Sequence, residues 1–270
     1  MKRYASMLGN TLLYVTMIVI AILLYNTVVN ALLAWGTFGN GEQLPAQVFI
    51  VLILAIGLSW VAYTIKYRIR ANAPSGGFIG MQQFTTLAWS RTAQLMLVGV
   101  AFALFYTAMM KLLLHHGVTD LSHFTEQYAD VAVYYLIASA VINTALELIL
   151  FIGILFNEVR RGIPTLWAVL IVSIIMAILQ PGGPAMQLIG VGLGFLYGYT
   201  YIRTNSIWSV ILIGCTFNVV FFTLVKTSAF DWIGSLNDVV LVLMIVVTAV
   251  YMAATLISRR VTLNKYGREG

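Results

Sequence analysis

Residues 143–162 read N-T-A-L-E-L-I-L-F-I-G-I-L-F-N-E-V-R-R-G and place one carboxyl group, that of Glu147, inside an otherwise apolar run. An ionisable side chain in hydrocarbon costs about 2.5–3.5 kcal/mol on insertion scales, so it normally faces a partner or a cavity. The region continues through Q-P-G-G-P at residues 180–184 and closes with S-I-W-S-V-I-L-I-G-C-T-F-N at residues 206–218. The other polar residues of this region are therefore candidate neighbours of Glu147.

The composition indicates a membrane protein with several spans. Of the 270 residues, 61% are hydrophobic and only 9% are charged, and a soluble domain of this length could not bury so much apolar surface. The net charge of +6 does not indicate binding to nucleic acid, because the basic residues lie in short segments between apolar runs. Cys215 is the single cysteine, so neither a disulfide framework nor a thiolate metal cluster is available.

We therefore expect an all-α, polytopic membrane protein with about eight transmembrane helices. The expected spans are residues 8–33, 47–63, 95–114, 131–156, 165–179, 185–201, 207–225 and 239–257. The first apolar run is too long for the h-region of a signal peptide, so we interpret it as a retained span. The chain then divides into three N-terminal helices (1–130), a core of four helices (131–226), and a last helix with a basic tail (227–270).

The basic residues predict the orientation of the chain in the membrane. With the N-terminus inside, only Lys111 and Lys226 fall at the outer ends of spans. The basic residues on the inner side are Lys2, Arg3, Lys66, Arg68, Arg70, Arg91, Arg160, Arg161, Arg203, Arg259, Arg260, Lys265 and Arg268. Cytoplasmic loops carry such an excess. We expect a multi-pass protein of the cell membrane with both termini in the cytoplasm.

This topology predicts which polar residues share a depth. Glu147 lies ten residues before Asn157, about 15 Å below the cytoplasmic surface at the rise of an α-helix. Asn218 lies eleven residues after Ile207, which places it at roughly 16 Å. Gln180 comes out deeper, beyond about 20 Å. We therefore expect Glu147 and Asn218 to contact one another or to share one water molecule.

The pattern formed by Gly153, Ser173, Pro181, Ser206-Ile207-Trp208 and Asn218 extends over about 75 residues. It resembles the CPBP family of intramembrane proteases, the CAAX-processing and bacteriocin-processing (Abi) group. That family carries Glu-Glu-x-x-x-Arg on one span, Phe-x-x-x-His on the next, and His-x-x-x-Asn or His-x-x-x-Asp on a later one. Aligned on Gly153 and Trp208, the four motif positions of this chain are Glu147, Gln180, Gly214 and Asn218.

The departures from the motif bear on catalysis. The resemblance implies a mechanism in which a glutamate and a histidine activate water, while a second histidine and the asparagine stabilise the oxyanion. Here Gln180 and Gly214 stand at the histidine positions, and Leu148 and Ile152 replace the second glutamate and the arginine. Each lost general acid or base typically lowers the rate by about 10²–10⁴. We expect a pseudoprotease without catalytic residues, in which the four motif positions are vestigial.

Glu147 itself has two interpretations. It is either a protonated structural residue, bonded to Asn143, to Asn218 or to a buried water, or part of a remodelled site for a ligand or partner. We expect neither a metal nor a cofactor there, because one carboxylate with two amides lacks the imidazole or thiolate that zinc sites normally use.

Two further patterns are interpreted structurally. His115, His116 and His123, near Asp120 and Glu126, are more typical of a solvated outer loop than of a cation site. Gly190, Gly194 and Gly198 recur every four residues, which predicts a face for close helix packing and not a phosphate loop.

For function we favour a non-catalytic membrane scaffold or regulator that binds another integral membrane protein through its transmembrane helices. The resemblance implies three kinds of partner: a cell-wall hydrolase, a sensor kinase, or a bacteriocin-immunity system. The alternative is a residual intramembrane CAAX-type endopeptidase that uses Glu147. A third hypothesis, a transporter of small molecules or lipids, is disfavoured because paired charges across several spans are absent from the sequence.

Overall fold

The computed structural model describes residues 2–24, 27, 43–70, 80, 82–118, 131–179 and 183–257. Within these ranges the chain is helical and contains no strand, which confirms the all-α prediction. In chain order the elements are α1 (Lys2–Leu24), α3 (Gln43–Arg70), α5 (Trp89–His115), α7 (Val133–Leu148), the π-helix η2 (Ile149–Phe156), α8 (Asn157–Val159), α9 (Thr165–Leu179), α10 (Gly183–Thr204), α11 (Ile207–Lys226), α12 (Ser228–Gly234) and α13 (Asp238–Ile257).

Six of the eight expected spans are long and apolar enough, over the described residues, to cross a membrane. They are Ser6–Leu24, Val48–Lys66, Trp89–His115, Val133–Val159, Ile207–Lys226 and Asp238–Ile257. The other two are helical but differ from these. Helix α9 has 15 residues and rises about 22 Å, less than a hydrocarbon core of roughly 30 Å. Helix α10 has 22 residues, but its glycines, tyrosines and threonines lower its apolarity.

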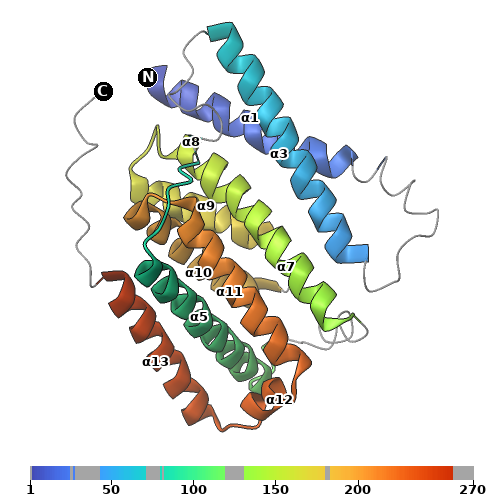
Figure 1. Ribbon diagram of the computed structural model, residues 1–270, viewed down its shortest axis with the longest axis vertical. Coiled ribbons are helices and arrows are strands. Elements are labelled where there is room, and N and C mark those ends of the chain that lie inside the picture. The colour runs from blue at the N-terminus through green and yellow to red at the C-terminus, as the bar shows by residue number, and fades with distance from the viewer. Residues whose placement is uncertain are drawn as a thin grey trace.

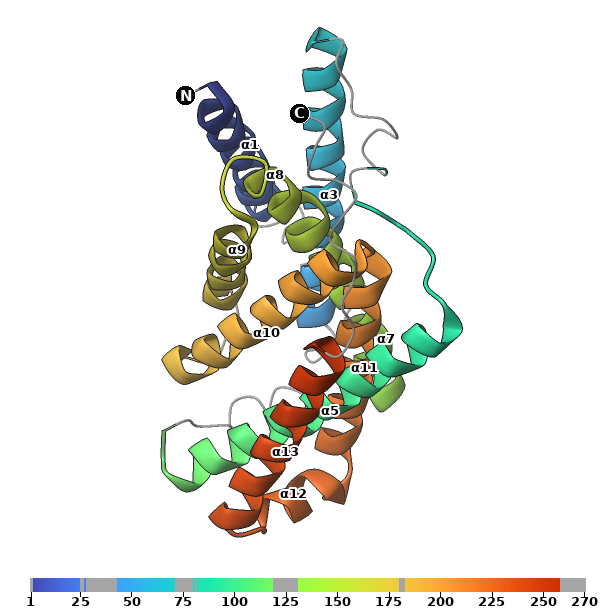
Figure 2. The same ribbon diagram turned by 90° about the vertical axis from the view of Figure 1, so that its left-hand side faces the viewer.

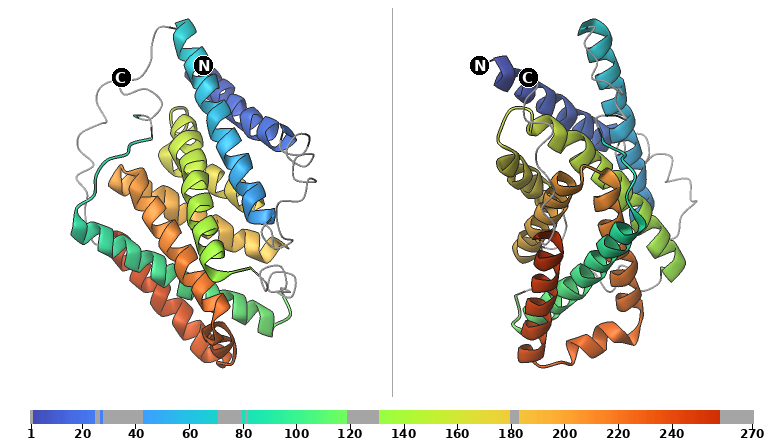
Figure 3. Two further views of the ribbon diagram at one scale, coloured as in Figure 1. Left: turned by 45° about the vertical axis from the view of Figure 1, so that its right-hand side comes forward. Right: turned by 60° about the vertical axis from the view of Figure 1, so that its left-hand side comes forward.

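The helices form a bundle in which α11 lies between α5 and α7 and packs along both (Figure 1). Helix α13 also packs on α5, and α10 packs mainly on α9. Figure 2 shows α10 between α9 and the α5–α13 pair. Helices α1 and α3 pair with one another at one flank of the bundle, opposite α5 and α13 (Figure 3). The short helices α8 and α12 lie toward opposite ends of the molecule (Figure 1).

Glycines allow the closest helix contacts. A Cβ atom at Gly99 of α5 would lie 2.7 Å from the carbonyl oxygen of Ile213 in α11. A Cβ atom at Gly194 of α10 would lie 2.6 Å from the Cα of Ser173 in α9, and one at Gly198 would meet Val169 of the same helix. Small residues let the backbones of membrane helices approach in this way. The prediction of a packing face is thus confirmed at Gly194 and Gly198.

The segment 82–88 covers the turn between α10 and α11. The carbonyl oxygen of Gln83 accepts a hydrogen bond from the backbone N–H of Ile207 at 3.1 Å. The hydroxyl of Ser206 donates to the carbonyl oxygen of Thr85 at 2.6 Å. The first N–H groups of a helix have no partner within that helix. The segment therefore supplies a partner to the start of α11, one of the central helices.

The orientation predicted from the basic residues is testable with two matched cysteine variants in a Cys215→Ser background. Ser90→Cys lies at the start of α5 and Ser235→Cys follows α12, and both serines are exposed. We expect a membrane-impermeant maleimide added to intact cells to label position 235 and not position 90, because Arg91 marks the inner side.

Permeabilised cells are the control, since both positions should then react. Labelling of position 90 in intact cells would reverse the predicted orientation.

Candidate functional site

The structure brings three of the four motif positions into one part of the bundle. Glu147 lies on α7 and is half-buried, and Gly214 and Asn218 lie on α11, which packs along α7. The fourth position, Gln180, is outside the described residues. The common level that the sequence predicts for Glu147 and Asn218 therefore corresponds to a contact region between two helices.

The space around Gly214 is filled by side chains from two other helices. A Cβ atom at this position would lie 2.7 Å from Cγ2 of Thr144 and 2.9 Å from Cδ1 of Leu148, both on α7. It would also lie 3.0 Å from the hydroxyl oxygen of Tyr197 on α10. Contacts under 3.0 Å are not tolerated without a shift of the neighbours. A side chain at position 214, where the family motif has a histidine, would thus require these neighbours to shift.

Asn218 has a different partner from the one expected. Its Nδ2 donates to the hydroxyl of Thr144 at 2.7 Å and to the carbonyl oxygen of Gly214 at 3.0 Å. These two bonds use both amide hydrogens. Asn218 therefore pairs with Thr144, which lies one turn before Glu147 on the same face of α7, and not directly with Glu147. The alternative, one water shared by Glu147 and Asn218, stays a prediction.

Tyr197 is a member of this site that the motif comparison missed. Its side chain is almost fully buried, and its hydroxyl is close enough to Glu147 and Cys215 to interact electrostatically with both. The helix rise that was applied to α7 and α11 places Tyr197 nearer the cytoplasmic surface than Glu147 and Asn218, so depth gave no signal for it. Tyr197 lies seven residues before the end of α10 at Thr204, or about 10 Å along the helix.

The other altered motif positions lie on or beside the π-helix η2. Ile152, at the position of the family arginine, is almost fully buried in the core. Gly153 faces Gln82, which is buried, and a Cβ atom at this glycine would lie 3.3 Å from Cγ of that glutamine. π-Helical segments occur frequently at functional sites. Here η2 buries its apolar side chains in the core, and Gln82 of the 82–88 segment packs against its Gly153.

A second polar cluster surrounds Glu158 at α8, and the sequence analysis did not single it out. The carboxylate is fully buried and accepts hydrogen bonds from Nη1 of Arg161 at 2.6 Å and from Nδ2 of Asn10 at 2.8 Å. A buried charge of this kind needs such partners. The spacing of Glu158 and Arg161 by three residues was the available signal. The cluster ties α1 to α8 and has a structural role.

The expected solvated loop of histidines is only partly as predicted. His115 and His116 lie at the end of α5, and both contact Asp238 at the start of α13, at 2.8 Å and 3.2 Å respectively. His123, Asp120 and Glu126 lie outside the described residues. Among the residues that are described, no three His, Cys, Asp or Glu side chains are grouped to hold a metal ion.

The described part of the site offers a carboxyl group, an amide and two hydroxyls. Glu147 could accept or donate a proton, whereas Thr144, Tyr197 and Asn218 supply hydrogen bonds. No imidazole belongs to this set, since the described histidines, His115 and His116, lie at the end of α5. The arrangement fits hydrogen bonding between helices better than activation of water, which needs a general base of matched pKa.

Comparison with known proteins identifies the family of this region. Residues 129–220 match the type II CAAX prenyl endopeptidase Rce1-like family. No curated protein and no solved structure matches the chain. The matched range contains α7, η2, α8, α9 and α10 and reaches into α11, so it includes every motif position. This part of the chain is therefore similar to the CPBP family of intramembrane proteases.

Proposed function

We propose that this chain is a non-catalytic CPBP-like membrane protein that binds another integral membrane protein as a scaffold or regulator. The observation that carries the proposal is the filled space at Gly214. A Cβ atom there would already lie 3.0 Å or less from side-chain atoms of Thr144, Leu148 and Tyr197. An imidazole at this position would therefore require all three neighbours to shift.

The remaining motif positions support the same interpretation. Oxyanion stabilisation needs a donor aimed at the developing charge. Both amide hydrogens of Asn218 are instead directed to Thr144 and Gly214. Leu148 and Ile152 are each 1% exposed, so apolar side chains fill the positions of the second acid and the arginine. Restoring the chemistry would require several coordinated substitutions.

Binding to a partner is supported by the exposure of α1 and α3. Only 11% of the apolar window of α1, 17% of that of α13 and 28% of that of α3 is buried, compared with 50% of that of α5, and of these three helices α1 and α3 carry an exposed glycine. Gly9 on α1 and Gly57 on α3 are exposed, and a Cβ atom at either would meet no heavy atom within 4 Å. Small residues on an exposed face let the backbone of a second helix approach closely. The proposed partner is a transmembrane helix of a cell-wall hydrolase, a sensor kinase or a bacteriocin-immunity protein.

The second candidate function is a residual CAAX-type endopeptidase. One observation favours it: the half-buried Glu147 is close enough to Tyr197 to interact with it electrostatically, and a carboxyl group can act as a general acid or base. Two features argue against this candidate. The described site contains no imidazole, and both amide hydrogens of Asn218 are already bonded to Thr144 and Gly214.

The first test is for peptidase activity. The purified full chain in lipid should leave prenylated CAAX peptides and bacteriocin leader peptides uncut, because the described site holds no imidazole and no available oxyanion donor. Mass spectrometry of the peptides gives the readout, with an active CPBP peptidase as positive control. Turnover that Glu147→Gln abolishes would instead establish the second candidate.

The second test is for the filled site. Gly214→Ala should lower the free energy of unfolding by about 1–3 kcal/mol, the usual effect of overpacking, because its methyl group meets Thr144 and Leu148. Gly192→Ala is the matched control on α10. No heavy atom lies within 4 Å of a Cβ there, and removal of a helical glycine stabilises by roughly 0.5–1 kcal/mol. Equal unfolding midpoints for the two variants in detergent would contradict the filled site.

The third test is for the partner surface. Gly57→Leu should reduce recovery of the cross-linked partner several-fold without loss of folded protein, because the leucine blocks close approach to α3. Quantitative mass spectrometry after cross-linking in cells and detergent pull-down measures the recovery. Val250→Leu, on the exposed face of α13, is the control and should behave as the unaltered protein. If neither substitution changes recovery, the exposed face of α3 is not the interface.

A further inference from the structure

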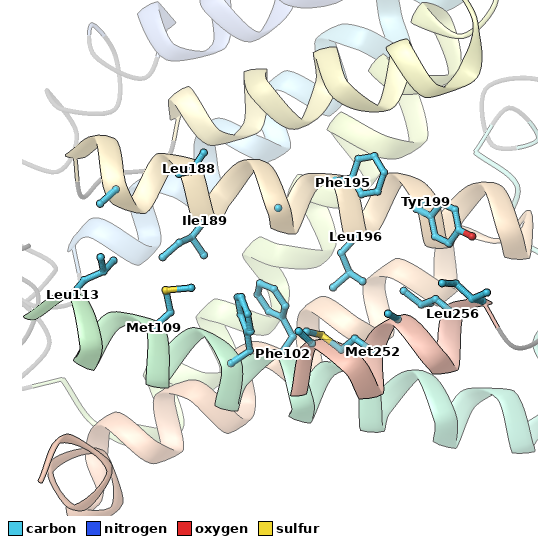
Figure 4. A pocket seen from close by; sticks show the side chains of 16 residues that line it. Phe102, Met109, Leu113, Leu188, Ile189, Phe195, Leu196, Tyr199, Met252 and Leu256 are labelled. Carbon is cyan, nitrogen blue, oxygen red and sulfur yellow. The ribbon is translucent and has the colours of Figure 1, made fainter. Parts of the chain in front are cut away.

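A long apolar groove separates α10 from the α5–α13 pair. It has a volume of about 700 Å³, which is within the range of ligand pockets. Figure 4 shows Phe102 and Met109 of α5, Leu196 of α10, and Met252 and Leu256 of α13 around one space. Helices α5 and α13 are candidate membrane spans. The groove therefore lies between candidate membrane spans, where molecules of the bilayer can reach it.

The length of the groove matches a lipid chain. The lining extends from Ala185 to Tyr199, which is about 21 Å along α10. This exceeds half of a hydrocarbon core of roughly 30 Å, the depth of one leaflet. An acyl chain of one leaflet can therefore lie along the groove.

One end of the groove meets a small polar pocket. Leu256 lines both, and Tyr199 at the end of the groove accepts hydrogen bonds from Nε and Nη2 of Arg203 at 2.9 Å and 2.7 Å. Arg91 lines the polar pocket beside Arg203, and its Nη2 lies 3.4 Å from the carbonyl oxygen of that residue. The described lining of this pocket contains two arginines and no carboxylate. Guanidinium groups bind phosphate oxygens well.

We propose that the groove is a binding site for an anionic phospholipid. The acyl chain lies along α10 against α5 and α13, and the phosphate lies at Arg91 and Arg203. Charge and depth agree, because both arginines fall on the predicted cytoplasmic side, where anionic lipids carry the surface charge. The lipid would fill the space that separates α10 from the α5–α13 pair. The proposal is independent of whether the chain retains peptidase activity.

The test measures lipid binding to the delipidated full chain by native mass spectrometry and by thermal unfolding in detergent. Phosphatidylglycerol should bind and raise the unfolding midpoint, and phosphatidylcholine should bind more weakly. Arg91→Gln and Arg203→Gln should each weaken phosphatidylglycerol about fivefold, and the double variant about 30-fold, as expected for arginines at an anionic surface. Lys226→Gln, at the end of α11, is the charge-matched control and should leave binding unchanged.

Two variants fill the groove from different helices. Gly192→Phe adds a ring from α10, where no heavy atom lies within 4 Å of a Cβ atom. Ala253→Phe adds a ring from α13, where Ala253 lines the groove. Each should abolish the lipid-dependent shift of the unfolding midpoint while the lipid-free midpoint is retained. The second variant decides the result if the first fails to fold.

Three outcomes would overturn the proposal. The first is equal binding of the two lipids without dependence on the arginines. The second is unchanged lipid binding by a folded groove-filling variant. The third is the same stabilisation by glycerol phosphate alone, which would show an anion site without a lipid.

Discussion

The close approach of α11 to its two neighbours is the constraint on which the rest of the bundle depends. Gly99 lets α5 reach the backbone of α11, and Gly214 lets α7 reach it from another side. Without water in the hydrocarbon, membrane helices associate mainly through such van der Waals packing and through hydrogen bonds between helices. The pair between Asn218 and Thr144 adds one of these bonds at the contact with α7. Most of the candidate site is therefore also the packing interface of the central helices.

This double role accounts for the residues that stand at the motif positions of this chain. A side chain at position 214 would require Thr144, Leu148 and Tyr197 to shift, whereas glycine lets α7 and α10 pack closely on α11. Leu148 and Ile152 then extend the apolar core into positions that are charged in the family motif. Apolar side chains at positions 148 and 152 pack in the core and avoid the cost of placing a charged group in hydrocarbon. Glu147 and Asn218 are the two polar residues that remain at the motif positions of α7 and α11, and Glu147 is half-buried.

The two glutamates of residues 143–162 show where sequence reasoning was incomplete. Glu147 attracted attention because it interrupts an apolar run, whereas Glu158, two residues before Arg160, was not singled out. In the structure Glu158 is the fully buried one, paired with Arg161 and with Asn10 from a distant part of the chain. Burial depends on where α1 crosses α8, and no local pattern encodes that crossing. The contact of Gln82 with Gly153 was missed for the same reason.

The sequence by itself determined the class of protein, the positions of the helices and the family region. Each membrane segment must satisfy its own backbone hydrogen bonds, so apolar length alone predicts a helix. Helix α9 is too short and α10 is too polar to be recognised as spans by this rule, which identifies six spans among the described residues. Only the tertiary structure decided that Asn218 meets Thr144, that Tyr197 fills the site, and that a groove separates α10 from α5 and α13. These features depend on the rotation and crossing of helices, which small residues far apart in the sequence set together.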